Sequence, residues 1–126
     1  KLSPEMCGIG PFVPHKDTKF KNENHGDVSL VLMLLSIIRL LKPNILLPAT
    51  TALGTVDPLG REKGILHGAN VVMPNLSPVK HRKDYSLYDN KICTGDEAAQ
   101  CIGCLADRMK KIGYEIVTDR GNYTEK

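Results

Sequence analysis

The chain has 126 residues, the size of one ordinary domain, and a formal net charge of +3 from 17 Lys and Arg against 14 Asp and Glu. A chain of this length buries roughly two-thirds of its unfolded surface, so it can form a core. The charges are scattered, KHRK at 80–83 is the only short basic cluster, and two Phe and four Tyr with no Trp offer few rings for stacking on bases. Composition therefore argues against nucleic acid as a partner.

Strands and helices are expected to alternate along the first part of the chain. Apolar runs closed by Gly or Pro predict buried strands at residues 6–14, 44–49 and 69–74. Asp27 can cap a helix over 28–42 that Pro43 ends, and Asp57-Pro58 can start a second helix that runs to His67 and ends at Gly68. Strands joined by crossover helices are parallel, so the pattern predicts an α/β fold of three βα units.

The N-terminal sequence and the cysteines predict the cellular compartment. KLSPEMCGIG has no apolar signal-peptide core, and four cysteines in an α/β pattern do not resemble a disulfide scaffold, so a reducing cytoplasm is predicted. The apolar run 28–41 is shorter than the ~18 residues that cross a bilayer, so we expect a buried helix and no membrane partner. Because Lys1 stands in place of Met, the chain is expected to be cut from a longer protein.

Polar and aromatic side chains follow the predicted strands. In parallel α/β sheets, ligands gather at the carboxyl ends of strands, where Pro11, His15, Thr50 and Thr51 fall. Tyr85 and Tyr88 lie in an irregular arm over 75–92 and can close over the same mouth. The alternatives are local capping for the hydroxyls, a backbone contact for the histidine and ordinary packing for the tyrosines.

Three thiols are concentrated near the C-terminus. Cys93, Cys101 and Cys104 follow C-x7-C-x2-C spacing, and the last two share one face of a helix expected at about 95–112. Thiolates select zinc or iron–sulfur clusters, so a metal site with a fourth ligand from elsewhere is one interpretation. The other is a set of reduced cytosolic thiols, and spacing alone leaves both open.

Several longer stretches carry a resemblance. GIGPFVPHKDTKF, NILLPATTALGT, GREKGILHGANVVMPNLSP and YSLYDNKIC, in this order, closely resemble the C-terminal part of the radical S-adenosylmethionine maturases of [FeFe]-hydrogenase, which are related to biotin synthase. The resemblance implies a TIM-type (β/α)8 barrel, of which residues 1–75 supply the last three βα units. Residues 76–126 then form the arm, the cysteine-bearing helix and the tail, a C-terminal helical extension like those of biotin and thiamin synthesis enzymes.

The resemblance also implies cofactors. In this family a CxxxCxxC loop near the start of the barrel holds a catalytic [4Fe-4S] cluster that cleaves S-adenosylmethionine, and the full-length enzyme acts on a small, sulfur-bearing organometallic precursor of the hydrogenase cluster. This sequence has no such motif, so no catalytic residue is expected here and the chain alone is predicted to be inactive. The resemblance places Met6, Thr50, Thr51, Tyr85 and Tyr88 at the cofactor and substrate cavity, beside Pro11 and His15. Cys93, Cys101 and Cys104 fall where some members bind a peripheral [2Fe-2S] cluster.

Two other functions compete with this one. A fragment of a biotin-synthase-like enzyme with a different substrate shares the superfamily, and a free-standing iron–sulfur or zinc module would serve electron transfer or interaction. An excised barrel segment leaves strand edges and one face of the 28–41 helix uncovered. We therefore expect the missing N-terminal part of the barrel as the natural partner, and self-association of the fragment without it.

Overall fold

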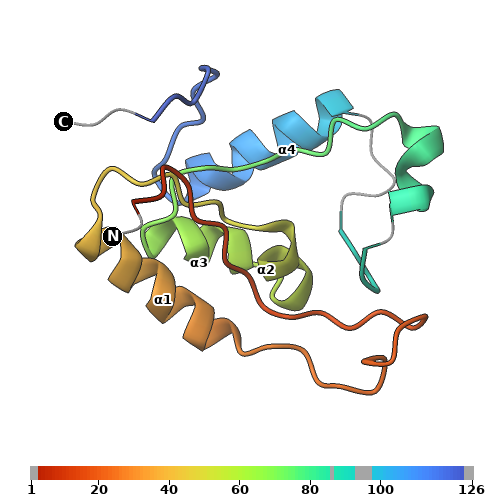
Figure 1. The fold of residues 1–126 in the computed structure, drawn as a ribbon. Helices are drawn as coiled ribbons and strands as arrows, with labels where there is room; N and C mark the ends of the chain where they lie inside the picture. The colour runs from red at the N-terminus through yellow and green to blue at the C-terminus, as the bar shows by residue number, and fades with distance from the viewer. Residues whose placement is uncertain (1–2, 86, 93–97, 124–126) are drawn as a thin grey trace.

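The computed structural model describes residues 3–85, 87–92 and 98–123. Its helices are α1 (Val28–Leu41), α2 (Thr51–Val56), α3 (Gly60–Leu66), the 3-10 helix η1 (Val79–Tyr85) and α4 (Ala98–Lys111). In Figure 1, α3 lies between α1 on one side and α4 on the other. The arm that carries η1 projects from the far end of α4.

The three predicted strands appear as extended segments that touch only at isolated bridges. Met6 pairs in parallel with Leu46, and Pro48 pairs in parallel with Val71. The order and direction match the prediction, but no regular strand forms within the described residues, so the complete βα units are not seen there. The reason is local: Pro48 has no N–H to continue the ladder, and neither outer segment has a further strand beside it in the described chain.

Helix α1 begins at the predicted residue and ends at Leu41, one residue before the predicted end. Asp27 caps it by accepting a hydrogen bond from the Ser29 N–H at 2.7 Å. Near its other end, Arg39 Nε donates to the Gly68 carbonyl at 2.8 Å, which ties α1 to the end of α3. Gly68 has φ +102°, the left-handed conformation that the sequence predicts for it. These contacts place α1 beside α3.

The segment between the second and third extended segments differs from the prediction. No helix was predicted at TTALGT, residues 50–55, but α2 forms there because the Thr50 side chain accepts a hydrogen bond from the Leu53 N–H at 3.3 Å and caps a helix. The helix predicted over 57–67 corresponds to α3, which is shorter. The two helices pack closely at Gly60, where a Cβ would lie 2.1 Å from the Leu53 carbonyl oxygen. Only glycine allows that approach.

One apolar core joins the helices to the extended segments. Alternate residues Ile45, Leu47 and Ala49 are buried against α1 and α3, and Met109 of α4 belongs to the same cluster. Because side chains alternate along an extended segment, Leu46, Pro48 and Thr50 fall on the opposite face. The bridge to Leu46 places Met6 on that face too, where it is 48% exposed. The layer is thus covered by helices on one face.

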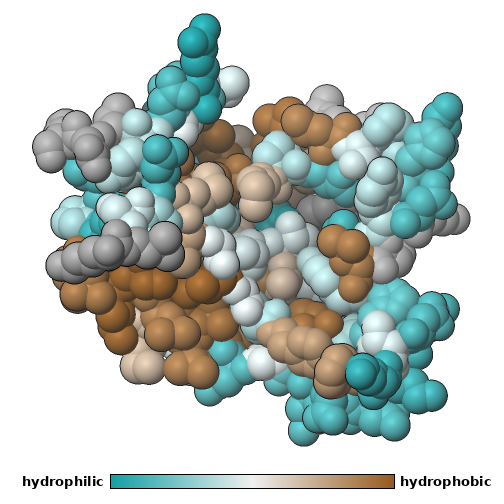
Figure 2. All heavy atoms as spheres, in the orientation of Figure 1, coloured by the Kyte–Doolittle hydropathy of each residue, from teal (hydrophilic) through white to brown (hydrophobic). Residues whose placement is uncertain are grey.

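The outer side of α1 is apolar and uncovered. Figure 2 shows hydrophobic side chains gathered over this helix. Six of its large apolar residues are exposed: Leu30, Met33, Leu34, Ile37, Leu40 and Leu41. Among the residues that the structure describes, no helix combines the length and the apolar character needed to cross a bilayer.

Candidate functional site

Three loops that were predicted to share one mouth lie close together. Gly10, within the first extended segment, packs on Thr50, and a Cβ at Gly10 would lie 2.7 Å from Thr50 Oγ1. The Asp89 N–H of the arm donates to the Pro14 carbonyl at 3.0 Å. Farther along the arm, the Ile92 N–H donates to Thr55 Oγ1 at 3.4 Å. The first loop (residues 11–26), helix α2 and the arm therefore border one another.

The adjacent threonines have different partners. Thr50 caps α2, as described above, and shares a face of the layer with Leu46 and Pro48. Thr51 Oγ1 accepts a hydrogen bond from Arg61 Nη2 at 3.3 Å, which links α2 to a buried arginine of α3. Local capping, the simpler interpretation of a loop threonine, therefore applies to Thr50, and its position at the mouth is compatible with a second role.

The first loop holds its predicted residues firmly. Pro11 is buried, and the Gly26 N–H closes the loop by donating to the Phe12 carbonyl at 2.8 Å. His15 is partly buried, and its Nδ1 accepts the Asp17 N–H at 3.1 Å. This hydrogen bond fixes the orientation of the imidazole ring within the loop.

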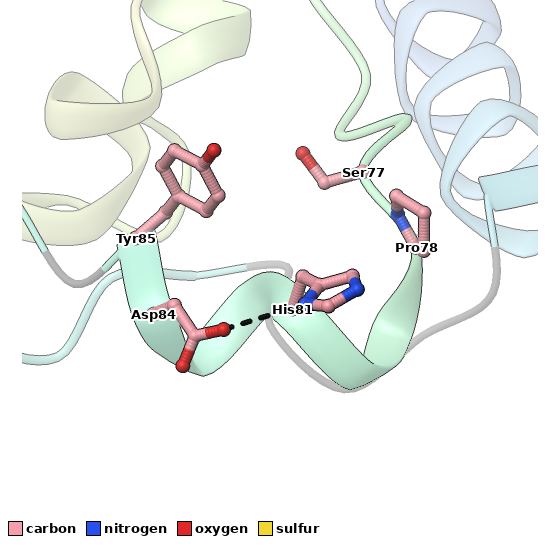
Figure 3. Close-up of a pocket in the computed structure, with 5 residues that line it drawn as sticks. All are labelled: Ser77, Pro78, His81, Asp84 and Tyr85. Atoms are coloured by element: carbon pink, nitrogen blue, oxygen red, sulfur yellow. Dashed lines mark ion pairs between the residues drawn. The ribbon is translucent and has the colours of Figure 1, made fainter.

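Tyr85 lines a cavity of about 650 Å³ together with Ser77, Pro78, His81 and Asp84. Figure 3 shows the Ser77 and Tyr85 hydroxyl groups facing each other across the opening, with His81 on η1 below them. His81 Nδ1 lies 3.5 Å from Asp84 Oδ2, one helical turn away. Tyr88, half-buried, lies beside Asp89, the residue that joins the arm to Pro14.

Ser77, His81 and Asp84 are the residue types of a hydrolytic triad, but their geometry does not fit one. A serine nucleophile requires a hydrogen bond to the imidazole that removes its proton. In the described structure no hydrogen bond joins Ser77 Oγ to His81. The cavity can bind a polar ligand through its hydroxyls and imidazole but does not carry an activated nucleophile.

The predicted thiol site is described only in part, because Cys93 lies outside the described residues. Cys101 is 3% exposed, and its Sγ accepts a hydrogen bond from the Asn75 N–H at 3.5 Å. Cys104, three residues along α4, is exposed. Within the described ranges no group of three or more potential ligands is placed to hold a metal ion. The two described thiols fit the chemistry of a cluster, since they supply sulfur donors one turn apart on one helix.

Helix α4 is fixed to α3 by an ion pair. Arg108 Nε and Nη2 donate to the two carboxylate oxygens of Glu62 at 2.5 and 2.6 Å. Burial alone raises the pKa of Glu62, but the hydrogen bonds and the positive charges of Arg108 and Arg61 outweigh burial, so the pKa lies below its ordinary value of 4.5. Glu62 therefore stays ionised at neutral pH and orients the cysteine-bearing helix.

Four residues of this region were not singled out from the sequence: Arg61, His81, Arg82 and Asp84. The His81 and Asp84 pair has the i, i+3 spacing of helical neighbours, a signal that was available within the KHRK cluster. Arg61 and Arg82 carried no such signal, because exposed and buried arginines look alike in a sequence. The sequence has no CxxxCxxC motif, and the three thiols that the structure describes, Cys7, Cys101 and Cys104, do not form a group placed to hold a metal ion.

The chain was compared with known proteins. No family model matches it. The [FeFe] hydrogenase maturase subunit HydE of Thermotoga maritima is 44% identical to it over 117 residues, which cover 93% of this chain. The chain spans about a third of that relative's length, 34%. The resemblance expected from the sequence is thereby confirmed, and the chain is HydE-like over nearly all its length, corresponding to the C-terminal part of that maturase.

Proposed function

We propose that this chain is the C-terminal part of a radical S-adenosylmethionine enzyme that helps to build the active-site cluster of [FeFe]-hydrogenase. Its similarity to HydE supports this function. The observation that carries the proposal is the meeting of three loops, in which Gly10 packs on Thr50, Pro14 bonds to Asp89 and Thr55 bonds to Ile92. A ligand at that mouth would touch all three loops.

In this function the three extended segments are the last three strands of a TIM-type barrel. Helices cover one face of the layer, and the face that carries Met6, Leu46 and Thr50 would look into the barrel. Thr50, Thr51 and His15 would orient S-adenosylmethionine and a small sulfur-bearing precursor, and Tyr85 and Tyr88 would exclude water. The [4Fe-4S] cluster of the rest of the enzyme supplies the radical chemistry, so this chain alone would be inactive.

The thiols would have a separate role. Cys93, Cys101 and Cys104 would hold a peripheral [2Fe-2S] cluster on the outer side of the arm, away from the chemistry. Two of these thiols lie one turn apart on α4, which the Glu62 and Arg108 pair holds in place. The cytoplasm, where thiols stay reduced, is the compartment in which such a site would be assembled.

The partner would be the rest of the barrel. The six exposed apolar residues of α1 and the uncovered edges of the layer would pack against it. Without that partner the same surfaces would drive self-association of the fragment. Sedimentation velocity at micromolar concentration is expected to show a dimer or a larger assembly.

A chimera tests the proposed function. This chain replaces the matched C-terminal part of Thermotoga maritima HydE, and the reconstituted chimera is assayed anaerobically for 5′-deoxyadenosine formation and hydrogenase maturation. Both activities are expected. Cleavage of S-adenosylmethionine without maturation would indicate a different substrate, as for a biotin-synthase-like enzyme. Absence of both, with reversible one-electron chemistry of the isolated chain, would indicate a free-standing iron–sulfur module.

A further inference from the structure

Arg82 is the bulkiest of the side chains that are fully buried in the described structure, with 2% exposure. It belongs to η1, a short 3-10 helix in an arm that otherwise exposes most of its side chains. Removing a guanidinium from water is costly unless hydrogen bonds replace the lost hydration. A buried arginine at this place therefore indicates a specific role in holding the arm.

Two hydrogen bonds of Arg82 reach one turn. Its Nε donates to the Ser77 carbonyl at 2.8 Å, and its Nη2 donates to the Asn75 carbonyl at 3.0 Å. The turn is closed by the Ser77 N–H, which donates to Asn75 Oδ1 at 3.2 Å. A planar guanidinium can grip two carbonyls at once, whereas a single ammonium cannot do so with the same geometry. Arg82 thus fixes the orientation of the 75–77 backbone.

The same turn faces the cysteine-bearing helix. The Asn75 N–H donates to Cys101 Sγ at 3.5 Å, and Cys101 is buried where it meets the turn. Hydrogen bonds from backbone N–H groups to sulfur ligands are among the contacts that tune thiolate-held clusters. Cys104, one turn farther along α4, is exposed. The two thiols of α4 therefore differ in their surroundings: Cys101 lies on the helix face that also buries Leu105 and Met109, and it meets the turn that Arg82 holds.

We infer that Arg82 is a positioning residue for the Cys101 thiol: by gripping the Asn75 and Ser77 carbonyls, it holds the Asn75 N–H against Cys101 Sγ and shields that sulfur from solvent. The metal-binding part of this inference rests on the proposed function of the thiols. The shielding part concerns the metal-free chain and stands without it.

The test compares two thiols within one molecule. The full 126-residue chain, free of metal, is treated with iodoacetamide, and the alkylation rates of Cys101 and Cys104 are resolved by fragment mass spectrometry. In the unsubstituted chain Cys101 is expected to react about tenfold more slowly than Cys104, because it must wait for local opening. Arg82→Met is expected to bring Cys101 to within about twofold of Cys104, and Arg82→Lys to an intermediate rate.

Arg39 provides a matched control. Like Arg82, it donates to two backbone carbonyls, of Gly68 and Pro43, but it is only partly buried and lies on α1. Arg39→Met is expected to leave the ratio of the Cys101 and Cys104 rates unchanged. Circular dichroism shows whether a variant has unfolded. If Arg82→Met has unfolded, the alkylation rates of Arg82→Lys test the inference in its place. The inference is overturned if Cys101 stays protected in a folded Arg82 variant, or if Arg39→Met exposes it equally.

Zinc binding separates this inference from the proposed thiol site. Affinity of the reduced chain for Zn²⁺ alone, measured by chelator competition, is expected to fall about tenfold in Arg82→Met and to stay unchanged in Arg39→Met. If the unsubstituted chain takes up no Zn²⁺ or iron, the metal site fails, while the alkylation pattern still decides the role of Arg82. Equal Zn²⁺ affinity of both variants would contradict the inferred effect on metal binding.

Discussion

The layer of extended segments with α1 to α3 and the C-terminal arm with α4 are held together by different forces. In the layer, apolar side chains such as Leu35, Leu47 and Leu53 form a fully buried cluster. In the arm and α4, polar contacts are added to burial: Arg82 to the 75–77 turn, Asn75 to Cys101, and Arg108 to Glu62. The comparison teaches that the layer is fixed by apolar burial, whereas α4 combines a buried apolar face that includes Met109 with polar contacts made by arginines.

Removal of a core side chain is the strongest way to break the layer. Leu47 is 0% exposed, and Leu47→Ala removes apolar contacts and leaves a cavity. We expect the free energy of unfolding to fall by about 3 kcal/mol. Urea unfolding followed by circular dichroism measures the change. Leu41→Ala, at a position 80% exposed, is the control and should cost no more than about 0.5 kcal/mol; similar losses for both would contradict a core centred on Leu47.

Removal of the charge of Arg108, which pairs with Glu62, tests whether polar contacts hold α4 against α3. Arg108→Met leaves the largely buried Glu62 carboxylate without its bidentate donor. We expect a loss of about 2 to 3 kcal/mol in the free energy of unfolding. Lys111→Met, also in the last turn of α4, is the control and should have little effect. An Arg108 variant as stable as the control would show that burial, not this pair, fixes α4.

The same pair predicts a pH dependence. The pKa of Glu62 is lowered in the folded chain, so its contribution is fully present above the ordinary value of 4.5 and is lost as the pH falls below it toward the folded pKa. The stability difference between the unsubstituted chain and Glu62→Gln should therefore be constant near neutral pH and shrink at acidic pH. Unfolding curves at a series of pH values check this. If this stability difference grew as the pH fell, the pKa of Glu62 would be raised in the folded chain and not lowered.

A surface ion pair should have the smallest effect. The pKa of Asp57 is lowered by a hydrogen bond from the Lys63 side chain and one from the Leu59 N–H. Solvent screens this pair, since the Lys63 side chain is about half exposed. Lys63→Met should therefore change the free energy of unfolding by less than about 0.5 kcal/mol. A loss as large as that of Arg108→Met would remove the distinction between surface and buried pairs.

The sequence predicted the layer better than the arm, for a physical reason. Hydrophobic pattern and caps are local, so α1 with its Asp27 cap and the left-handed Gly68 could be predicted. The short helix α2 was missed, because TTALGT has the composition of a turn and becomes helical through the Thr50 cap and packing on Gly60. Arg108 acts through Glu62, which is distant in sequence, and Arg82 acts through backbone carbonyls of the preceding turn, which no side-chain pattern reveals.

The central claim is that the loops meeting at Thr50 form one side of an S-adenosylmethionine cavity, and affinity for that cofactor tests it most directly. In the chimera with Thermotoga maritima HydE, Thr50→Ala should weaken binding of S-adenosylmethionine about tenfold, and Thr50→Ser should restore it. Asp27→Ala removes a comparable N-terminal cap, from α1, and should leave affinity unchanged. Calorimetry that finds Thr50→Ala and Asp27→Ala indistinguishable from the unsubstituted chimera would contradict the account.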